Sequence, residues 1–168
     1  MISDNKNQND IINSELLKSY EIEYSFSDKP LKRVKIKPKV EDKTELLKNL
    51  HDKISKIENC ELKSNASKLV FSDGISNSHI MLVGEGPGQK EDDIGKPFVG
   101  DAGLLLNKML NSINIDRKNI YITNVVNYRP PNNRKPESSE IKRYSNFLRE
   151  HISIIDPKIL ILMGSTAM

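Results

Sequence analysis

The chain has 168 residues, of which 36% are hydrophobic and 5% aromatic, and it carries a formal net charge of +3. This length favours a single folded domain, and so small a net charge does not by itself indicate a nucleic-acid partner. The single cysteine, Cys60, excludes an intramolecular disulfide and any cluster held only by cysteines of this chain. No apolar run is long enough to cross a membrane and the polar start is no signal peptide, so we expect a cytoplasmic protein without a membrane partner.

Residues 1–43 are predicted to form a polar extension that precedes the folded domain. Their basic cluster consists of Lys32, Arg33, Lys35, Lys37 and Lys39. Such a charge run is typical of a solvated or disordered segment, and an arm that contacts nucleic acid is the alternative. The folded domain is predicted over residues 44–168. It opens with a helix, because apolar residues recur at helical spacing from Leu46 to Ile57.

Three short apolar runs predict an α/β sheet with strands at Ile80–Gly84, Ile120–Val126 and Lys158–Gly164. Runs of this kind that alternate with helical segments are typical of buried parallel strands. The intervening helices are predicted at Ala102–Ile113 and Ser138–Ile155. The first of them is expected to turn Leu104, Leu105, Met109 and Leu110 toward the core. Because open sheets bind ligands outside the carboxyl ends of their strands, the loops that follow the strands are the candidate site.

The loop after the first strand reads GEGPG, from Gly84 to Gly88. A glycine-rich turn lets backbone N–H groups converge on an acceptor, and a tight turn needed only for packing is the alternative. The loop is no P-loop, because no Gly-Lys-Ser/Thr follows. It is also a poor dinucleotide fingerprint, because Pro87 interrupts it and no helix is expected to open directly after Gly88. We therefore expect a small ligand rather than a pyrophosphate.

Further side chains in these loops could bind or react with a ligand. The acidic ones are Glu85, Glu91, Asp92 and Asp93, which could bind a metal ion, orient a water molecule or simply be solvated. Phe98 is either a ring that caps the core or a platform that stacks on a planar ligand. Asn124 could read the polar edge of a base or satisfy backbone groups. Three cations, Arg129, Arg134 and Lys135, lie in a proline-rich loop that could hold them against phosphates.

Three long segments resemble successive motifs of the uracil-DNA glycosylase superfamily, specifically its family 4 type. They are VGEGPGQKEDDIGKPFVGDAGLLLNKML, YITNVVNYRPPNNRKPESSEI and IDPKILILMGSTAM, and the resemblance runs from about Ile54 to the last residue. It implies a three-layer α/β/α sandwich with a parallel central sheet. It also implies an enzyme of base excision repair that flips uracil out of DNA and hydrolyses its N-glycosidic bond.

The resemblance implies roles for the residues that would face the base. Phe98 would stack on the uracil ring, and Asn124 would read the polar edge of that ring. The backbone of Gly86 and Gly88 would approach the base closely, as only glycine allows. These four residues are the predicted base-binding set.

Two further roles follow from the resemblance. Glu85 lies in the motif that places the attacking water, which makes it the candidate catalytic residue. Arg129 and Arg134 would grip the phosphates of the DNA backbone. Uracil-containing DNA is therefore the expected partner.

The chain departs from the resemblance at the cofactor. Family 4 enzymes carry a [4Fe–4S] cluster on four cysteines, and the motifs place Ile57, Cys60, Tyr128 and Tyr144 at those positions. Because only Cys60 can supply a thiolate, we expect neither this cluster nor another metal or cofactor. The two tyrosines are expected to fill the vacated volume as structural replacements.

A second departure concerns the end of the chain. The family continues past the position of Met168 with a helix, a strand and a loop whose histidine assists the departing uracil, and we expect these last elements to be missing here. The histidines of this chain, His51, His79 and His151, do not lie in that place and are each expected on the surface or on a helix face.

Three hypotheses follow for the function. The chain is a uracil-DNA glycosylase homologue whose activity alone is doubtful, a non-catalytic nucleic-acid-binding module, or one piece of a split glycosylase. In the last case its partner is a separate C-terminal fragment that finishes the sheet.

Overall fold

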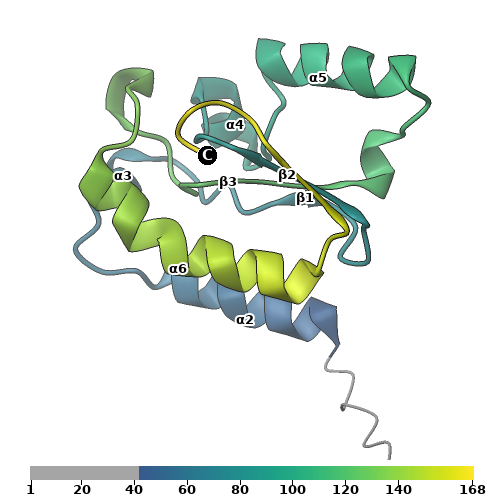
Figure 1. The fold of residues 1–168 in the computed structure, drawn as a ribbon. Helices are drawn as coiled ribbons and strands as arrows, with labels where there is room; N and C mark the ends of the chain where they lie inside the picture. Colours follow the sequence, from purple (N-terminus) through teal and green to yellow (C-terminus); the bar gives the residue numbers. More distant parts are fainter. Residues whose placement is uncertain (1–41) are drawn as a thin grey trace, which may run out of the picture. The chain divides into compact units, whose positions relative to one another are not determined.

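The computed structural model describes residues 42–168, so the basic cluster of the N-terminal extension lies outside the described residues. The domain alternates helices and strands along the chain (Figure 1). In order, the elements are α2 (Lys43–Ser55), α3 (Glu61–Asn65), β1 (Asp73–Gly74), β2 (Ile80–Gly84), α4 (Gln89–Ile94), α5 (Asp101–Ser112), the 3-10 helix η1 (Arg117–Asn119), β3 (Tyr121–Asn124), the 3-10 helix η2 (Pro131–Asn133), α6 (Ser138–Ile155) and β4 (Ile159–Leu162).

The described strands form one open sheet with the order β1-β3-β2-β4. Strand β2 pairs in parallel with both β3 and β4, whereas the two-residue strand β1 pairs antiparallel with β3. The predicted α/β class is confirmed, and the sheet is mostly rather than wholly parallel. The sequence did not predict β1, because two residues are too few to show a periodic pattern.

Helices cover both faces of the sheet, which gives three layers (Figure 1). Helices α2 and α6 pack against each other on one face, and α5 lies on the other. Successive residues of β2 alternate between two hydrophobic cores: Met81 and Val83 face the α2 and α6 side, while Leu82 belongs to the cluster under α5. Within residues 42–168, no helix combines the length and the apolar character needed to span a bilayer.

The predicted boundaries of β2 and α6 agree with the structure, but the predicted inner face of α5 is wrong. Leu110 is buried as predicted, but Leu104, Leu105 and Met109 are exposed, and α5 buries Leu106 in their place. Both stripes have helical spacing, so periodicity alone could not choose between them. The choice is made by Gly103, whose missing side chain lets this face of the helix approach the chain at Phe98.

Helix α4 corrects a second expectation, because it opens directly after Gly88. Glu91, at the third position of the helix, accepts a hydrogen bond from the Gly88 N–H at 3.1 Å and so caps the first turn. The signal was therefore a glycine followed three residues later by a glutamate. Pro87 did not prevent the helix, since it lies before the cap.

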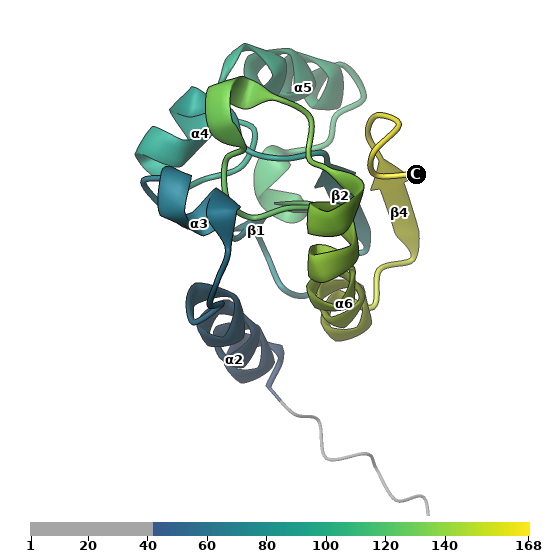
Figure 2. The ribbon, with the colours of Figure 1, turned by 90° about the vertical axis from the view of Figure 1, so that its left-hand side faces the viewer.

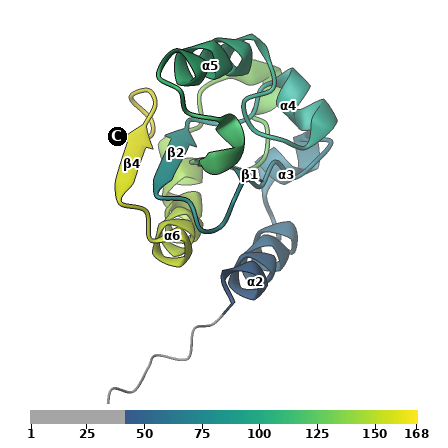
Figure 3. The same cartoon turned by 90° about the vertical axis from the view of Figure 1, so that its right-hand side faces the viewer.

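Strand β4 forms one edge of the described sheet, and Figures 2 and 3 show no helix or strand outside it. Its four residues are apolar, yet their exposed fractions range from 53% at Ile159 to 38% at Leu162. Since successive side chains of a strand point to opposite faces, both faces of β4 are open. An all-apolar strand of this kind is ordinarily covered on both sides.

His151 differs from the other two histidines, because the helix face on which it lies is buried. His51 and His79 are exposed, but His151 is 1% exposed inside the core between α6 and the sheet. Its ring packs on Phe71, with centroids 4.6 Å apart, and on Tyr121 at 5.9 Å. Its Nε2 has no hydrogen-bond partner among the described residues. Burial without a partner lowers the pKa of His151 to about 4.

This burial predicts an acid-sensitive core. Between the native pKa of about 4 and the ordinary histidine pKa of 6.5, the unfolded chain binds the additional proton. The free energy of unfolding should therefore fall as the pH drops through this window, by up to about 3 kcal/mol. In His151→Leu, this component of the pH dependence should vanish. Urea denaturation at a series of pH values measures it, with His51→Gln as the exposed control. A His151→Leu variant that kept the full slope would refute the assignment.

Candidate functional site

The site is built around the point where β2 and β3 end side by side. In their parallel register Gly84 is the partner of Asn124, and the Val125 N–H donates to the Gly84 carbonyl at 2.8 Å. A Cβ at Gly84 would lie 2.5 Å from Asn124 Oδ1 and 2.5 Å from Phe98 Cζ. The amide of Asn124 and the ring of Phe98 therefore meet above a residue that has no side chain, which only glycine permits here.

The Asn124 carboxamide differs from the polar groups beside it. Thr123 Oγ1 donates to the Phe71 carbonyl at 2.8 Å, and Asn127 Nδ2 donates to the Val70 carbonyl at 3.2 Å, whereas the Asn124 amide has no such tie to another described residue. The residue is only 3% exposed. A side chain that satisfies backbone groups, which was the alternative for Asn124, is therefore found at Asn127. Asn124 keeps a donor and an acceptor for a ligand.

The backbone of Phe98 is held in an unusual conformation, with φ at 53°. Arg117 fixes it, because Nη1 donates to the Phe98 carbonyl at 2.9 Å and Nη2 donates to the Pro97 carbonyl at 2.7 Å. The same guanidinium is anchored by Asp73, whose Oδ2 accepts from Nε at 2.9 Å. Sequence reasoning missed Arg117, because it lies about twenty residues from the loop that it holds and matches no motif.

Two more residues complete the hold on Phe98. Gly103 lies so close that a Cβ there would be 1.9 Å from the Phe98 carbonyl oxygen. Glu91 accepts hydrogen bonds from the N–H groups of Val99 at 2.9 Å and Gly100 at 2.7 Å. The ring of Phe98 is half-buried against the α5 core. It is thus a preorganised platform rather than a mobile side chain.

The acidic residues of the first loop divide into three kinds. Glu91 and Asp92 satisfy backbone groups: Asp92, which is buried, accepts from the N–H groups of Ser67 and Lys68 at 2.9 Å. Asp93 is exposed. Glu85 follows Gly84 at the end of β2 and accepts a hydrogen bond from the Thr166 hydroxyl. Within residues 42–168, no group of three or more potential metal ligands is brought together.

The remaining glycines of the loop, Gly86 and Gly88, are also sites of close approach. A Cβ at Gly86 would lie 2.9 Å from Val126 Cγ2, and one at Gly88 would lie 2.9 Å from Glu91 Oε2. Packing therefore suffices to require glycine at both positions. Their contact with a base stays a prediction.

The cations of the proline-rich loop are differently engaged. Arg134 forms a two-pronged pair with Glu140 at the start of α6, with both N–O distances 2.8 Å. The hydrogen bond from Arg134 lowers the pKa of Glu140. Arg129 is bound only by the neutral oxygen of Asn133, at 2.7 Å, among the described residues. Arg134 thus ties the loop to α6, and Arg129 keeps its charge uncompensated.

The fold and this strand-end site belong to a known class of domain. Residues 71–168 match the family model of the uracil DNA glycosylase superfamily. This segment contains Gly84, Phe98, Asn124 and both arginines. The chain belongs to the uracil-DNA glycosylase superfamily.

The similar curated proteins make the relationship more specific. The type-4 uracil-DNA glycosylase of Thermotoga maritima is 41% identical over 124 residues, which are 74% of this chain and 65% of the relative. The type-4 enzymes of Sulfurisphaera tokodaii and Saccharolobus solfataricus are 42% and 44% identical, over 70% and 67% of this chain and 54% and 53% of theirs. The chain is therefore of the family 4 type and spans about half to two thirds of the length of these relatives.

The residues at the expected cluster position do not fit a [4Fe–4S] group. Cys60, Tyr128 and Tyr144 are buried in one core cluster, and Cys60 Sγ lies 3.4 Å from the Tyr144 hydroxyl. Such a cluster requires four thiolates, and the chain has one cysteine. Burial raises the pKa of Tyr144 and of Tyr128, so both remain protonated phenols. We therefore derive no chemistry from this cofactor.

The hold on Phe98 predicts that Arg117 positions the site. Arg117→Lys keeps the charge, but one ammonium nitrogen cannot replace the three guanidinium nitrogens that reach Asp73, Asn107 and the carbonyls of residues 97 and 98. We therefore expect a loss of about 1–2 kcal/mol in the free energy of unfolding. Urea denaturation measures this loss, and the adjacent exposed Lys118→Ala is the control. If Arg117→Lys matched Lys118→Ala, the proposed hold would be absent.

Proposed function

We propose that this domain is a uracil-DNA glycosylase homologue that takes a flipped-out uracil into the space between Phe98 and Asn124. One observation carries the proposal: a preorganised ring converges over Gly84 with an amide that has no partner among residues 42–168. A flipped base needs stacking on its face and hydrogen bonds on its edge to offset the cost of leaving the duplex. The names of the relatives support uracil as that base.

The base would be recognised by three sets of contacts. The Phe98 ring would stack on uracil, and the Asn124 carboxamide would donate to and accept from the polar edge. The backbone of Gly86 and Gly88 would border the base on the side of β2. Because Asn124 is nearly buried, its amide would remain unpaired with any ligand that lacked the matching edge, which gives selectivity.

For the chemical step we propose Glu85 as the residue that orients the attacking water. It is the first residue after Gly84, and its carboxylate accepts a hydrogen bond from the Thr166 hydroxyl. The water would attack the sugar carbon as the N-glycosidic bond breaks and the electron pair leaves with uracil. Donors placed against this developing negative charge would govern the rate.

The DNA strand would be held by the loop that follows β3. Both Arg129 and Arg134 are proposed to face phosphates, but they should contribute unequally. Arg129 is bound only to a neutral oxygen of Asn133, whereas Arg134 shares its charge with Glu140. Arg129 should therefore bind a phosphate more strongly than Arg134 does, while Arg134 keeps the loop in place.

Selectivity tests the proposed recognition. We expect the wild-type chain to bind single-stranded DNA with one uracil more tightly than the same strand with thymine, and Asn124→Ala to remove about tenfold of that preference. Fluorescence anisotropy with labelled strands measures it, and Asn111→Ala, exposed on α5, is the control. Equal preference in wild type and Asn124→Ala would refute Asn124 as the reading residue.

We also propose that catalysis requires a further polypeptide segment that packs on β4. The four apolar residues of β4 are open on both faces, and an edge strand offers unpaired backbone groups to a further strand. The greater length of the relatives favours their C-terminal part as the occupant. By resemblance that part carries the histidine that assists the departing uracil. Without it the chain would act as a nucleic-acid-binding module.

Complementation tests this requirement. Co-expression with the C-terminal segment of the Thermotoga maritima relative should give a complex that releases uracil from single-stranded and duplex DNA. The chain alone should be slower by about 10²–10³-fold, the cost of one missing preorganised donor. Ile161→Asp on β4 should prevent the complex. Full activity of the chain alone would refute the requirement for the further segment. No release of uracil in either condition would refute the proposal that the domain is a uracil-DNA glycosylase.

A further inference from the structure

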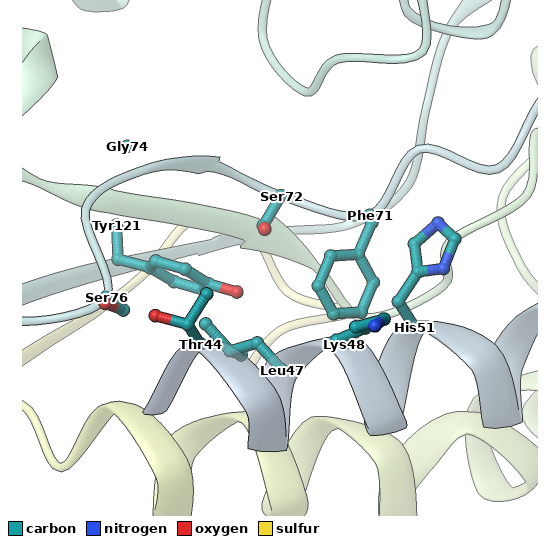
Figure 4. A pocket seen from close by; sticks show the side chains of 9 residues that line it. All are labelled: Thr44, Leu47, Lys48, His51, Phe71, Ser72, Gly74, Ser76 and Tyr121. Carbon is teal, nitrogen blue, oxygen red and sulfur yellow. The ribbon is translucent and has the colours of Figure 1, made fainter. Parts of the chain in front are cut away.

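A pocket lies near the amino end of β3, at the opposite end of this strand from Asn124. It has a volume of about 400 Å³ and lies between α2 and the segment of residues 71–76. Tyr121, the first residue of β3, forms part of its wall (Figure 4). The volume falls within the range of small-molecule sites. Nothing in the proposed uracil chemistry uses this space.

The hydroxyl of Tyr121 is the first sign that the pocket takes a ligand. Tyr121 is 2% exposed, and its hydroxyl has no hydrogen-bond partner among the described residues. Burial raises the pKa of this phenol, and the Ser72 hydroxyl, which lies beside it without meeting the geometry of a hydrogen bond, offsets part of the rise. In Figure 4 the Tyr121 hydroxyl points into the pocket. A buried hydroxyl without a partner is rare and costly, so a group that enters the pocket would recover that cost.

The remaining walls divide the pocket into chemically different parts (Figure 4). Thr44, Ser72 and Tyr121 each contribute a hydroxyl group to the lining, on the side of the pocket away from His51. The apolar side chains of Leu47 and Phe71 line the middle. Such a wall suits a planar or apolar body.

The other end of the pocket is basic. Lys48 and His51 lie three residues apart on α2, which places them on the same face of the helix. Lys48 forms no ion pair within residues 42–168, and Asp52, 3.4 Å from His51, is the acidic group beside this end. A mobile lysine at the rim of a pocket can meet an anionic group of a ligand without prior desolvation.

We propose that this pocket binds a small organic anion of nucleotide size. A polar group of the ligand accepts from or donates to the Tyr121 hydroxyl, its planar body lies along Phe71 and Leu47, and its anionic group meets Lys48. The site is independent of the uracil pocket, because the two lie at opposite ends of β3. Binding here neither requires Asn124 nor depends on glycosylase activity.

Calorimetric titration with AMP, adenosine and inorganic phosphate tests the proposal, since none of these probes carries the uracil edge. We expect AMP to bind at least about tenfold more tightly than either fragment. Tyr121→Phe should weaken AMP binding by about three- to tenfold. Lys48→Gln should weaken AMP binding by a similar factor without changing that of adenosine. Lys118→Gln and Asn124→Ala are the controls and should bind AMP as the wild type does.

Three results would overturn the proposal. The first is no heat of binding with any probe up to about 1 mM, which would leave an ordered water as the partner of Tyr121. The second is AMP binding that Tyr121→Phe and Lys48→Gln both leave unchanged. The third is AMP binding that Asn124→Ala abolishes, which would move the ligand to the uracil pocket. Because Lys48 is exposed, Lys48→Gln keeps the test valid if Tyr121→Phe is unstable.

Discussion

The parallel pairing of β2 with β3 is the contact on which the rest of the domain depends. Its register sets Gly84 against Asn124, and the hydrogen bonds continue one residue beyond the strands, from Val125 to Gly84. Shifting the pairing by one residue would turn Asn124 to the other face of the sheet and exchange the two cores. The same register that distributes the apolar residues of β2 between α5 and α6 therefore also brings an amide and a ring together.

Most polar side chains near this contact serve the backbone rather than a ligand. Arg117 holds the carbonyls of residues 97 and 98, Glu91 holds three N–H groups, and Arg134 is paired with Glu140. These hydrogen bonds order the loops when the domain folds, so that a ligand would bind without a further loss of conformational entropy in the site. Asn124 stands apart because its neighbours' hydrogen bonds leave its amide unused. A polar side chain that forms no hydrogen bond to the described residues is the one suited to recognising a ligand.

Two features of the domain are unusual: polar atoms are buried in the core, and apolar side chains are exposed at the edge of the sheet. The Tyr121 hydroxyl and His151 Nε2 are polar atoms without partners inside the core, while the apolar side chains of β4 are open at the sheet edge. Each costs free energy in the isolated chain. The Tyr121 hydroxyl borders the pocket for which we propose a ligand, and β4 is the surface for which we propose further polypeptide. His151 has no such counterpart, and its burial shows as a lowered pKa.

The sequence by itself determined the α/β class, the extents of β2 and α6, and the superfamily, because buried strands, amphipathic helices and long ordered motifs are local patterns. It also placed Asn124 and the loop from Gly84 to Gly88 at strand ends, since the carboxyl-end rule needs only the strand order. The expected role of Phe98 came from the resemblance instead. Only the tertiary structure decided which stripe of α5 is buried, that Arg117 supports Phe98, that Arg134 is paired, and that His151 is internal. Each of these depends on residues distant in sequence, and the charge, size and spacing of one residue do not specify which neighbour it will meet.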